Sequence, residues 1–125
     1  EIMGFENGYE TLIGERGVTL SGGQKQRISI ARALIKAPEI VLFDDCLSAV
    51  DAKTENHIIG HLYEYLKAKT ALIVTHRIFA GFKFDQIIVL EDGIIIEQGT
   101  HEELMNLNGY YAELYKLQLQ TNKEA

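Results

Sequence analysis

The stretch Leu20-Ser21-Gly22-Gly23-Gln24 places a serine and two glycines directly in front of a segment of helix-forming residues. Serine is a favoured N-cap residue, and glycine lets a bulky oxyanion approach the backbone closely. The first amides of a helix also carry the positive end of its dipole. The stretch therefore predicts a phosphate-binding helix start that needs no lysine, although a flexible Ser-Gly-Gly turn has the same local sequence.

Two apolar runs downstream predict strands that end in polar side chains. The first, residues 40–45, closes on two carboxylates, and the second, residues 70–75, is followed by His76. Continuous apolar runs of this length are typical of buried strands in parallel sheets. Since ligand chemistry in open α/β sheets gathers at the carboxyl ends of strands, we expect Asp44, Asp45 and His76 to share one rim.

The residues before and between these runs predict two helices. The first spans about residues 22–36, is closed by Pro38, and carries apolar residues at helical spacing, namely Ile28, Ala31, Leu34 and Ile35. The second spans residues 52–66 and has an apolar face formed by Ile58, Ile59, Leu62, Tyr63 and Leu66. The strand-helix-strand order predicts a crossover between parallel strands.

The two ends of the chain differ in pattern. Residues 1–19 are rich in glycine and are expected to form turns. Residues 86–90 and 94–97, joined through Asp92-Gly93, predict an antiparallel hairpin. Thr100 with Glu103 three residues on predicts a capping box, residues 110–117 predict one further helix, and residues 121–125 are expected to fray.

Composition bounds the class of protein. The 125 residues are 46% hydrophobic, which suits one globular domain, and the net charge of −6 argues against a general nucleic-acid surface. Cys46 is the single cysteine, so no intrachain disulfide can form and a reducing setting fits. No apolar run exceeds about four residues, against the ~20 that span a bilayer.

The order of these pieces resembles the nucleotide-binding domain of ATP-binding cassette (ABC) transporters. Residues 20–24 resemble its LSGGQ signature, residues 40–45 its Walker B strand, Ser48 to Asp51 its D-loop, and His76 its switch histidine. Residues 11–17 are similar to the X-loop of the exporter branch, and residues 99–104 to the helix start after the last hairpin in exporters. The resemblance implies an α/β fold: a partial P-loop NTPase (ABC ATPase-like) domain with a parallel βαβ core, a C-terminal β-hairpin and helices.

The resemblance also implies roles for individual residues. In this family two domains close head to tail over two ATP molecules, so residues 20–24 (Leu20, Ser21, Gly22, Gly23 and Gln24) would contact ATP held by the partner. Asp44 would hold Mg²⁺, Asp45 and His76 would be catalytic, and Asp51 would read the partner domain. Glu15 and Arg16 of the X-loop would meet the membrane domain.

One residue departs from the family pattern. Hydrolytic sites of the family usually carry glutamate where this chain has Asp45. Aspartate is one methylene shorter, so its carboxylate would retreat by ~1.5 Å from a hydrogen bond that must be about 2.6 to 3.2 Å long. A 1 Å misplacement costs on the order of 10²-fold in rate. Asp45 therefore predicts a slow or degenerate site, as in one chain of a heterodimeric exporter.

The sequence contains no G-x-x-x-x-G-K-[ST] phosphate loop. By resemblance, we expect residues 1–125 to be the C-terminal part of one nucleotide-binding domain, with the Walker A half and the transmembrane domain encoded elsewhere in a longer chain. Such a piece alone is expected to lack ATPase activity. The full protein would be an ATPase of the exporter type, at the cytoplasmic face of the cell (inner) membrane, paired with a second nucleotide-binding subunit.

Three alternatives stay open at the level of sequence. A soluble ABC ATPase of the DNA-repair or translation type would use the same motifs, although the X-loop resemblance and the acidic charge argue against it. A module that dimerises on ATP without turnover would suit Asp45. A homodimeric exporter with a slow site is the third alternative.

Overall fold

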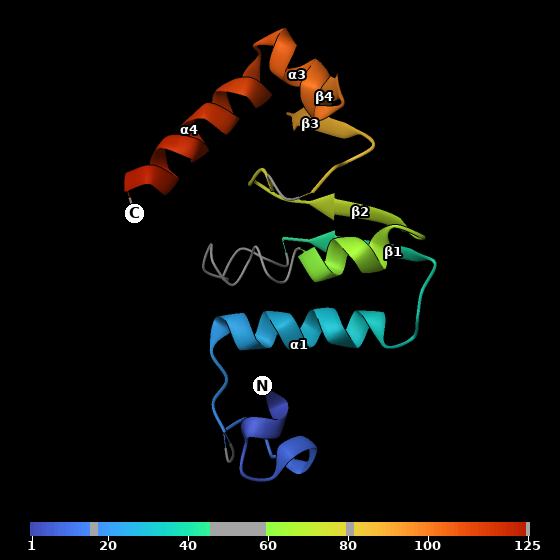
Figure 1. The fold of residues 1–125 in the computed structure, drawn as a ribbon, viewed down its shortest axis with the longest axis vertical. Coiled ribbons are helices and arrows are strands. Elements are labelled where there is room, and N and C mark those ends of the chain that lie inside the picture. Colours follow the sequence, from blue (N-terminus) through green and yellow to red (C-terminus); the bar gives the residue numbers. More distant parts are fainter. Residues whose placement is uncertain (16–17, 46–59, 80–81, 125) are drawn as a thin grey trace.

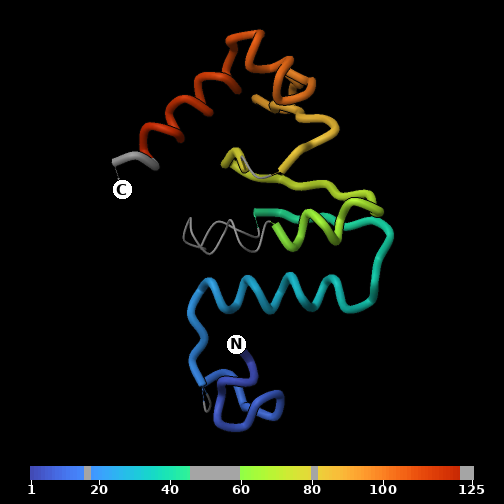
Figure 2. The backbone as a smooth tube through the Cα atoms, viewed as in Figure 1, coloured from blue at the N-terminus to red at the C-terminus, as the bar shows by residue number. Residues whose placement is uncertain are grey.

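The computed structural model describes the backbone of residues 1–15, 18–45, 60–79 and 82–124 (Figures 1 and 2). Within these ranges, residues 60–66 are helical, in line with the end of the predicted helix 52–66. The named elements are the short 3-10 helices η1 (Ile2–Gly4) and η2 (Gly8–Glu10), α1 (Gly22–Leu34), β1 (Ile40–Asp44), β2 (Thr70–Val74), β3 (Ile87–Glu91), β4 (Ile94–Gly99), α3 (His101–Leu107) and α4 (Tyr110–Glu124).

Strands β1 and β2 form a parallel pair, as predicted from the strand-helix-strand order. Ile40 pairs with Thr70 and Asp44 with Val74, without a register shift. Figure 1 shows α1 and β1 running in opposite directions, so that the start of α1 and the end of β1 point the same way. The fold class predicted from sequence is therefore confirmed in its parallel core.

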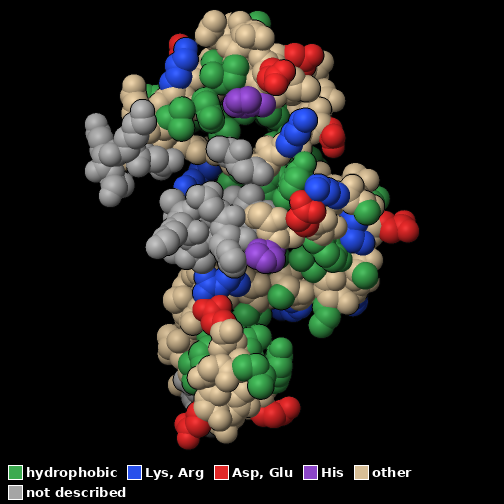
Figure 3. All heavy atoms as spheres, viewed as in Figure 1, with side chains coloured by type: hydrophobic (Ala, Val, Ile, Leu, Met, Phe, Trp, Pro, Cys, Tyr) green, Lys and Arg blue, Asp and Glu red, His purple; other side chains and the backbone are tan. Residues whose placement is uncertain are grey.

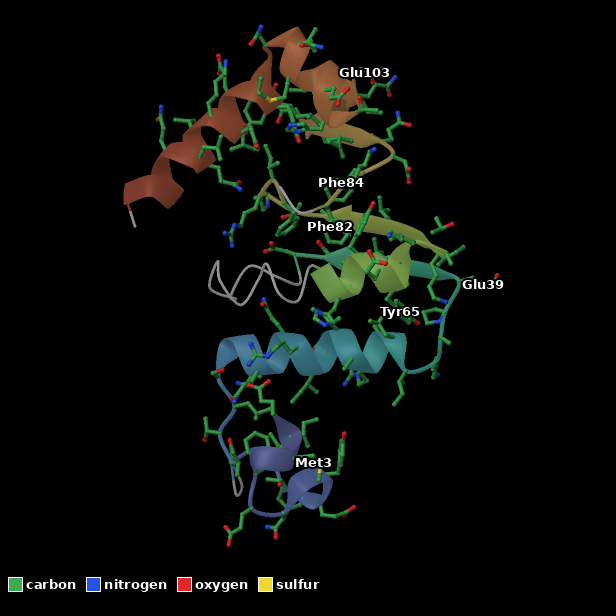
Figure 4. All side chains as sticks on the ribbon, in the orientation of Figure 1. Met3, Glu39, Tyr65, Phe82, Phe84 and Glu103 are labelled. Carbon is green, nitrogen blue, oxygen red and sulfur yellow. The ribbon has the colours of Figure 1, made fainter. Side chains whose placement is uncertain are left out.

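The hydrophobic core lies on one face of this pair. It consists of the buried side chains of α1, β1, the helical residues 60–66 and the segment after β2, namely Ile30, Val41, Phe43, Leu62, Leu66 and Phe79. Phe82 and Phe84 pack against the same cluster, with their rings stacked at a centroid distance of 5.1 Å (Figure 4).

The prediction that the first strand is buried throughout is wrong in this structure. Burial alternates along β1, because Val41 and Phe43 face the core whereas Ile40 and Leu42 are 74% and 62% exposed. Figure 3 likewise shows hydrophobic side chains at the surface of the molecule. The described helices cover one face of the strand, so the apolar run has a second apolar face turned outward.

The predicted face of the first helix is also partly wrong. Ile30 and Leu34, one turn apart, pack into the core, whereas Ile35 is 82% exposed and Ala31 is exposed. The helix carries two overlapping apolar stripes, and helical periodicity alone cannot choose between them. It ends at Leu34 rather than Lys36, four residues ahead of Pro38.

The hairpin of β3 and β4 follows the prediction. Asp92 and Gly93 have φ values of +48° and +77°, which is the conformation of a two-residue type I′ turn. The register shifts after Val89, where Val89 pairs with Glu97 and Leu90 with Ile95. A shift of this kind is a β-bulge, which adds one unpaired residue to β4 and bends the strand locally.

The two C-terminal helices begin with side-chain caps. Thr100 and Glu103 form the predicted capping box of α3, which ends at Asn108 in the left-handed conformation. Glu97 of β4 caps α4, because its two carboxylate oxygens accept from the amides of Tyr110 and Tyr111 at 2.5 and 3.1 Å. The helix continues to Glu124, so the fraying predicted beyond Gln120 is not seen.

Replacing Glu97 with alanine is expected to loosen the first turn of α4. Loss of a capping carboxylate costs about 0.5–2 kcal/mol, which corresponds to roughly 2- to 30-fold faster amide exchange in that turn. Hydrogen exchange on the full-length protein measures this directly. Glu91→Ala, at an exposed position of the same hairpin, is the matched control; equal exchange in both variants would contradict the capping role.

Candidate functional site

The start of α1 is organised by the predicted serine cap. Ser21 Oγ accepts from the amide of Gln24 at 3.2 Å, and Gln24 Oε1 accepts from the amide of Ser21 at 2.9 Å. These two bonds form a capping box that fixes the first turn. The side chain of Leu20 is buried at 8% exposure, while Ser21 and Gly22 are exposed. The buried side chain of Leu20 thus anchors the turn, while Ser21 and Gly22 face solvent.

This geometry leaves polar groups for a ligand. The first amides of a helix have no acceptor within the helix, and they carry its positive dipole end. The hydroxyl of Ser21 accepts from Gln24, so its own hydrogen can still be donated. The arrangement suits a multiply charged anion.

An ion pair stands beside this helix start. The guanidinium of Arg27 donates to both carboxylate oxygens of Glu1, and Gln24 Nε2 donates to the same carboxylate at 3.3 Å. The hydrogen bond from Arg27 is the main cause that lowers the pKa of Glu1, against a smaller opposing effect of burial. Gln24 therefore connects the capping box to the ion pair that Arg27 of α1 forms with Glu1 of the N-terminal segment.

The second part of the site is the rim where β1 and β2 end. Asp44 closes β1 opposite Val74, and the amide of Asp45 donates to the carbonyl of Val74 at 2.8 Å. His76 lies two residues after Val74, the last residue of β2. Asp44, Asp45 and His76 are all exposed. The register thus brings Asp44, Asp45 and His76 to one end of the sheet, as the sequence predicted.

Asp45 has an unusual backbone conformation. Its φ is +48°, in the left-handed region that aspartate tolerates better than most residues. It also borders a small hollow lined mainly by core side chains and by Thr75. The conformation and the hydrogen bond to Val74 fix the place from which the carboxylate projects.

The turn that carries His76 is held on both sides. Thr75 Oγ1 accepts from the amide of Arg77 at 3.0 Å, and Phe79 is buried in the core. Gln118 of α4 bonds to both backbone groups of Ile78. Sequence reasoning missed Gln118, because a glutamine 40 residues away on another helix gives no local signal of this contact.

The other predicted site residues give less structural information. Asp51 and Arg16 lie outside the described residues, as do Ser48 and Cys46. Glu15 is exposed, in a turn next to the backbone bridge between Ile13 and Val18. Within the described ranges, no group of three or more histidine, cysteine or acidic side chains could hold a metal ion. The carboxylate of Asp44 fits Mg²⁺, which often takes one or two protein carboxylates and completes its shell with phosphates and water.

Comparison with known proteins supports the resemblance to ABC transporters that the sequence motifs indicate. The family model described as "ABC transporter" matches residues 1–48. The probable multidrug resistance ABC transporter ATP-binding/permease protein YheI of Bacillus subtilis is 57% identical over 112 residues, covering 90% of this chain and 19% of that protein. The ATP-dependent lipid A-core flippase of Salmonella typhimurium is 49% identical over 114 residues, covering 91% and 20%.

A solved structure agrees with these relatives. The structure of a bacterial Atm1-family ABC exporter with ATP bound superposes with a TM-score of 0.81 at 41% identity, covering 94% of this chain and 20% of that one. The chain is therefore part of an ATP-binding domain of the ABC transporter family. The matched relatives are a probable multidrug resistance transporter, a flippase and an exporter, and this chain spans about one fifth of the length of each.

Replacing Ser21 with alanine is expected to open the first turn of α1. The lost cap costs about 0.5–2 kcal/mol of helix stability. Hydrogen exchange of residues 21–25 in the full-length protein would rise accordingly. Ser29→Ala is the matched control, since Ser29 is exposed within the same helix and alanine is the better helix former. Unchanged exchange in Ser21→Ala would show that the capping box does not hold the turn.

Proposed function

We propose that this chain is part of the ATP-hydrolysing subunit of an ABC exporter, in which ATP-driven closure of two nucleotide-binding domains powers transport across a membrane. The observation that carries the proposal is the serine-capped, open first turn of α1, in a chain whose matched relatives include exporters. No described helix is both long and apolar enough to cross a membrane.

The start of α1 would act on ATP bound to a partner domain. Ser21, Gly22 and Gly23 would present a hydroxyl and backbone amides to the γ-phosphate, and Gln24 would add its side chain. Leu20 would anchor the turn from the buried side. The support is the exposure of Ser21 and Gly22, whose hydroxyl and amide can meet an anion without rearrangement. The side chain of Gln24 would first have to leave Glu1.

The rim of β1 and β2 would form this chain's own nucleotide site. Asp44 would hold Mg²⁺, which neutralises phosphate charge when bound. Asp45 would orient the attacking water, His76 would reach the γ-phosphate, and Asp51 would contact the partner domain. Glu15 and Arg16 would face the membrane domain, which places the subunit at the cytoplasmic face of the cell (inner) membrane. The common end of the two strands supports this grouping.

Asp45 would make this site slow, so the second subunit would be a different chain with a stronger site. The fixed backbone of Asp45 supports the argument, because its φ and its hydrogen bond to Val74 leave little freedom to compensate for the shorter side chain. The intact signature would then complete the partner's hydrolytic site, as in a heterodimeric exporter.

Asp45→Glu should raise ATP hydrolysis by the full-length complex. The added methylene restores the reach of the carboxylate, and recovery of a 1 Å misplacement is worth up to about 10²-fold. A steady-state ATPase assay measures the change. Asp85→Glu, at an exposed position outside β1 and β2, controls for the added methylene. Intact ATP binding with unchanged turnover would remove the geometric argument.

Ser21→Asp should abolish hydrolysis at the partner's site. Aspartate caps a helix as well as serine does, so the turn is kept, but its negative charge would oppose the γ-phosphate. Ser21→Asn caps equally well without the charge and should retain turnover. Single-turnover hydrolysis by the complex compares the two variants, and retained turnover in Ser21→Asp would refute contact in trans.

Asp45 also favours a second function, a module that dimerises on ATP without turnover at its own site. The site would still hold ATP and, through Asp44, Mg²⁺, but the short side chain of Asp45 would reach the attacking water poorly. ATP-dependent association of the two subunits without hydrolysis in Asp45→Glu would favour this function over the exporter ATPase.

A further inference from the structure

The segment after β2 has a side-chain partner on the C-terminal helix. Gln118 of α4 accepts from the amide of Ile78 at 3.0 Å through Oε1 and donates to the carbonyl of Ile78 at 2.5 Å through Nε2. One primary amide thus satisfies both backbone groups of one residue, as a neighbouring strand residue does in an antiparallel sheet. Ile78 and Gln118 are both half-buried, which strengthens these bonds against competition from water.

His76 lies between two residues, Val74 and Ile78, whose backbone groups are hydrogen-bonded to other parts of the chain. On its N-terminal side, Val74 accepts from the amide of Asp45. On its C-terminal side, Ile78 is held by Gln118 and Phe79 is buried in the core. The side chain of the exposed histidine can therefore be aimed by the backbone beneath it, and α4 supplies one of the two supports.

We propose that Gln118 is a positioning residue for His76, through which the C-terminal helix sets the direction of the histidine toward the nucleotide. The inference rests on the proposed role of His76 at the γ-phosphate. It gives α4 a part in the ATP cycle: movement of α4 relative to β2 would stretch the Gln118–Ile78 bonds and release the histidine turn.

Hydrogen exchange on the full-length complex tests this inference. The peptide covering residues 75–79 is followed without nucleotide, with Mg²⁺ and ADP, and with Mg²⁺ and ATP. In the wild type, ATP should protect this peptide more than ADP does. In Gln118→Leu, which removes both bonds to Ile78, exchange without nucleotide should be about 4- to 100-fold faster, or two- to tenfold for each lost hydrogen bond, and the extra protection by ATP should disappear.

Kinetics separate positioning from general stability. In Gln118→Leu, kcat for ATP should fall several-fold while KM changes less than twofold. In a His76→Ala background, Gln118→Leu should cause no further fall, because its effect passes through the histidine. Gln120→Leu, at an exposed position on the same helix, should match the wild type in both measurements.

The outcomes distinguish failure of the inference from failure of the proposed function. If ATP protects residues 75–79 equally in the wild type and in Gln118→Leu, Gln118 does not position the histidine. If α4 itself exchanges faster both in this variant and in Gln118→Ala, the glutamine serves the helix and the inference also fails. If ATP and ADP protect the wild-type peptide equally, the proposed role of His76 fails first.

Discussion

The parallel pairing of β1 with β2 is the constraint on which the rest of the structure depends. It turns Val41 and Phe43 toward the side chains of α1 and residues 60–66, which builds the core. The same register brings two neighbouring carboxylates, at the end of β1, and a histidine, two residues after β2, to one end of the sheet. A shift of one residue would turn Val41 and Phe43 outward and move Asp44 along the sheet relative to His76.

Features specified within a few residues could be predicted from the sequence. The serine cap of α1, the capping box at Thr100 and the turn at Asp92-Gly93 each depend on side chains and φ values inside one short segment. The rim of Asp44, Asp45 and His76 needed one further rule, that strands joined by a helix run parallel. The family resemblance then supplied the roles proposed for these residues.

Features that depend on distant partners could not be predicted. Apolar residues lie on two overlapping stripes of α1. Ile30 packs into the core together with Phe43 of β1, whereas Ile35, which follows the helix, stays exposed. The exposure of Ile40 and Leu42 on the outward face of β1 depends on what packs over that face, and the residues of the strand itself do not reveal this. The contact between Gln118 and Ile78 joins residues 40 positions apart, with no periodicity to reveal it.

The close approach of Gly109 to Glu97 leaves little room for a side chain where α3 meets α4. A Cβ at position 109 would collide with Glu97 Oε1, so a side chain there would push the capping carboxylate away from the start of α4. The carboxylate cap of α4 therefore depends on the absence of a side chain at position 109. Natural variation at this position would loosen the start of the same helix that carries Gln118 to the segment of the histidine.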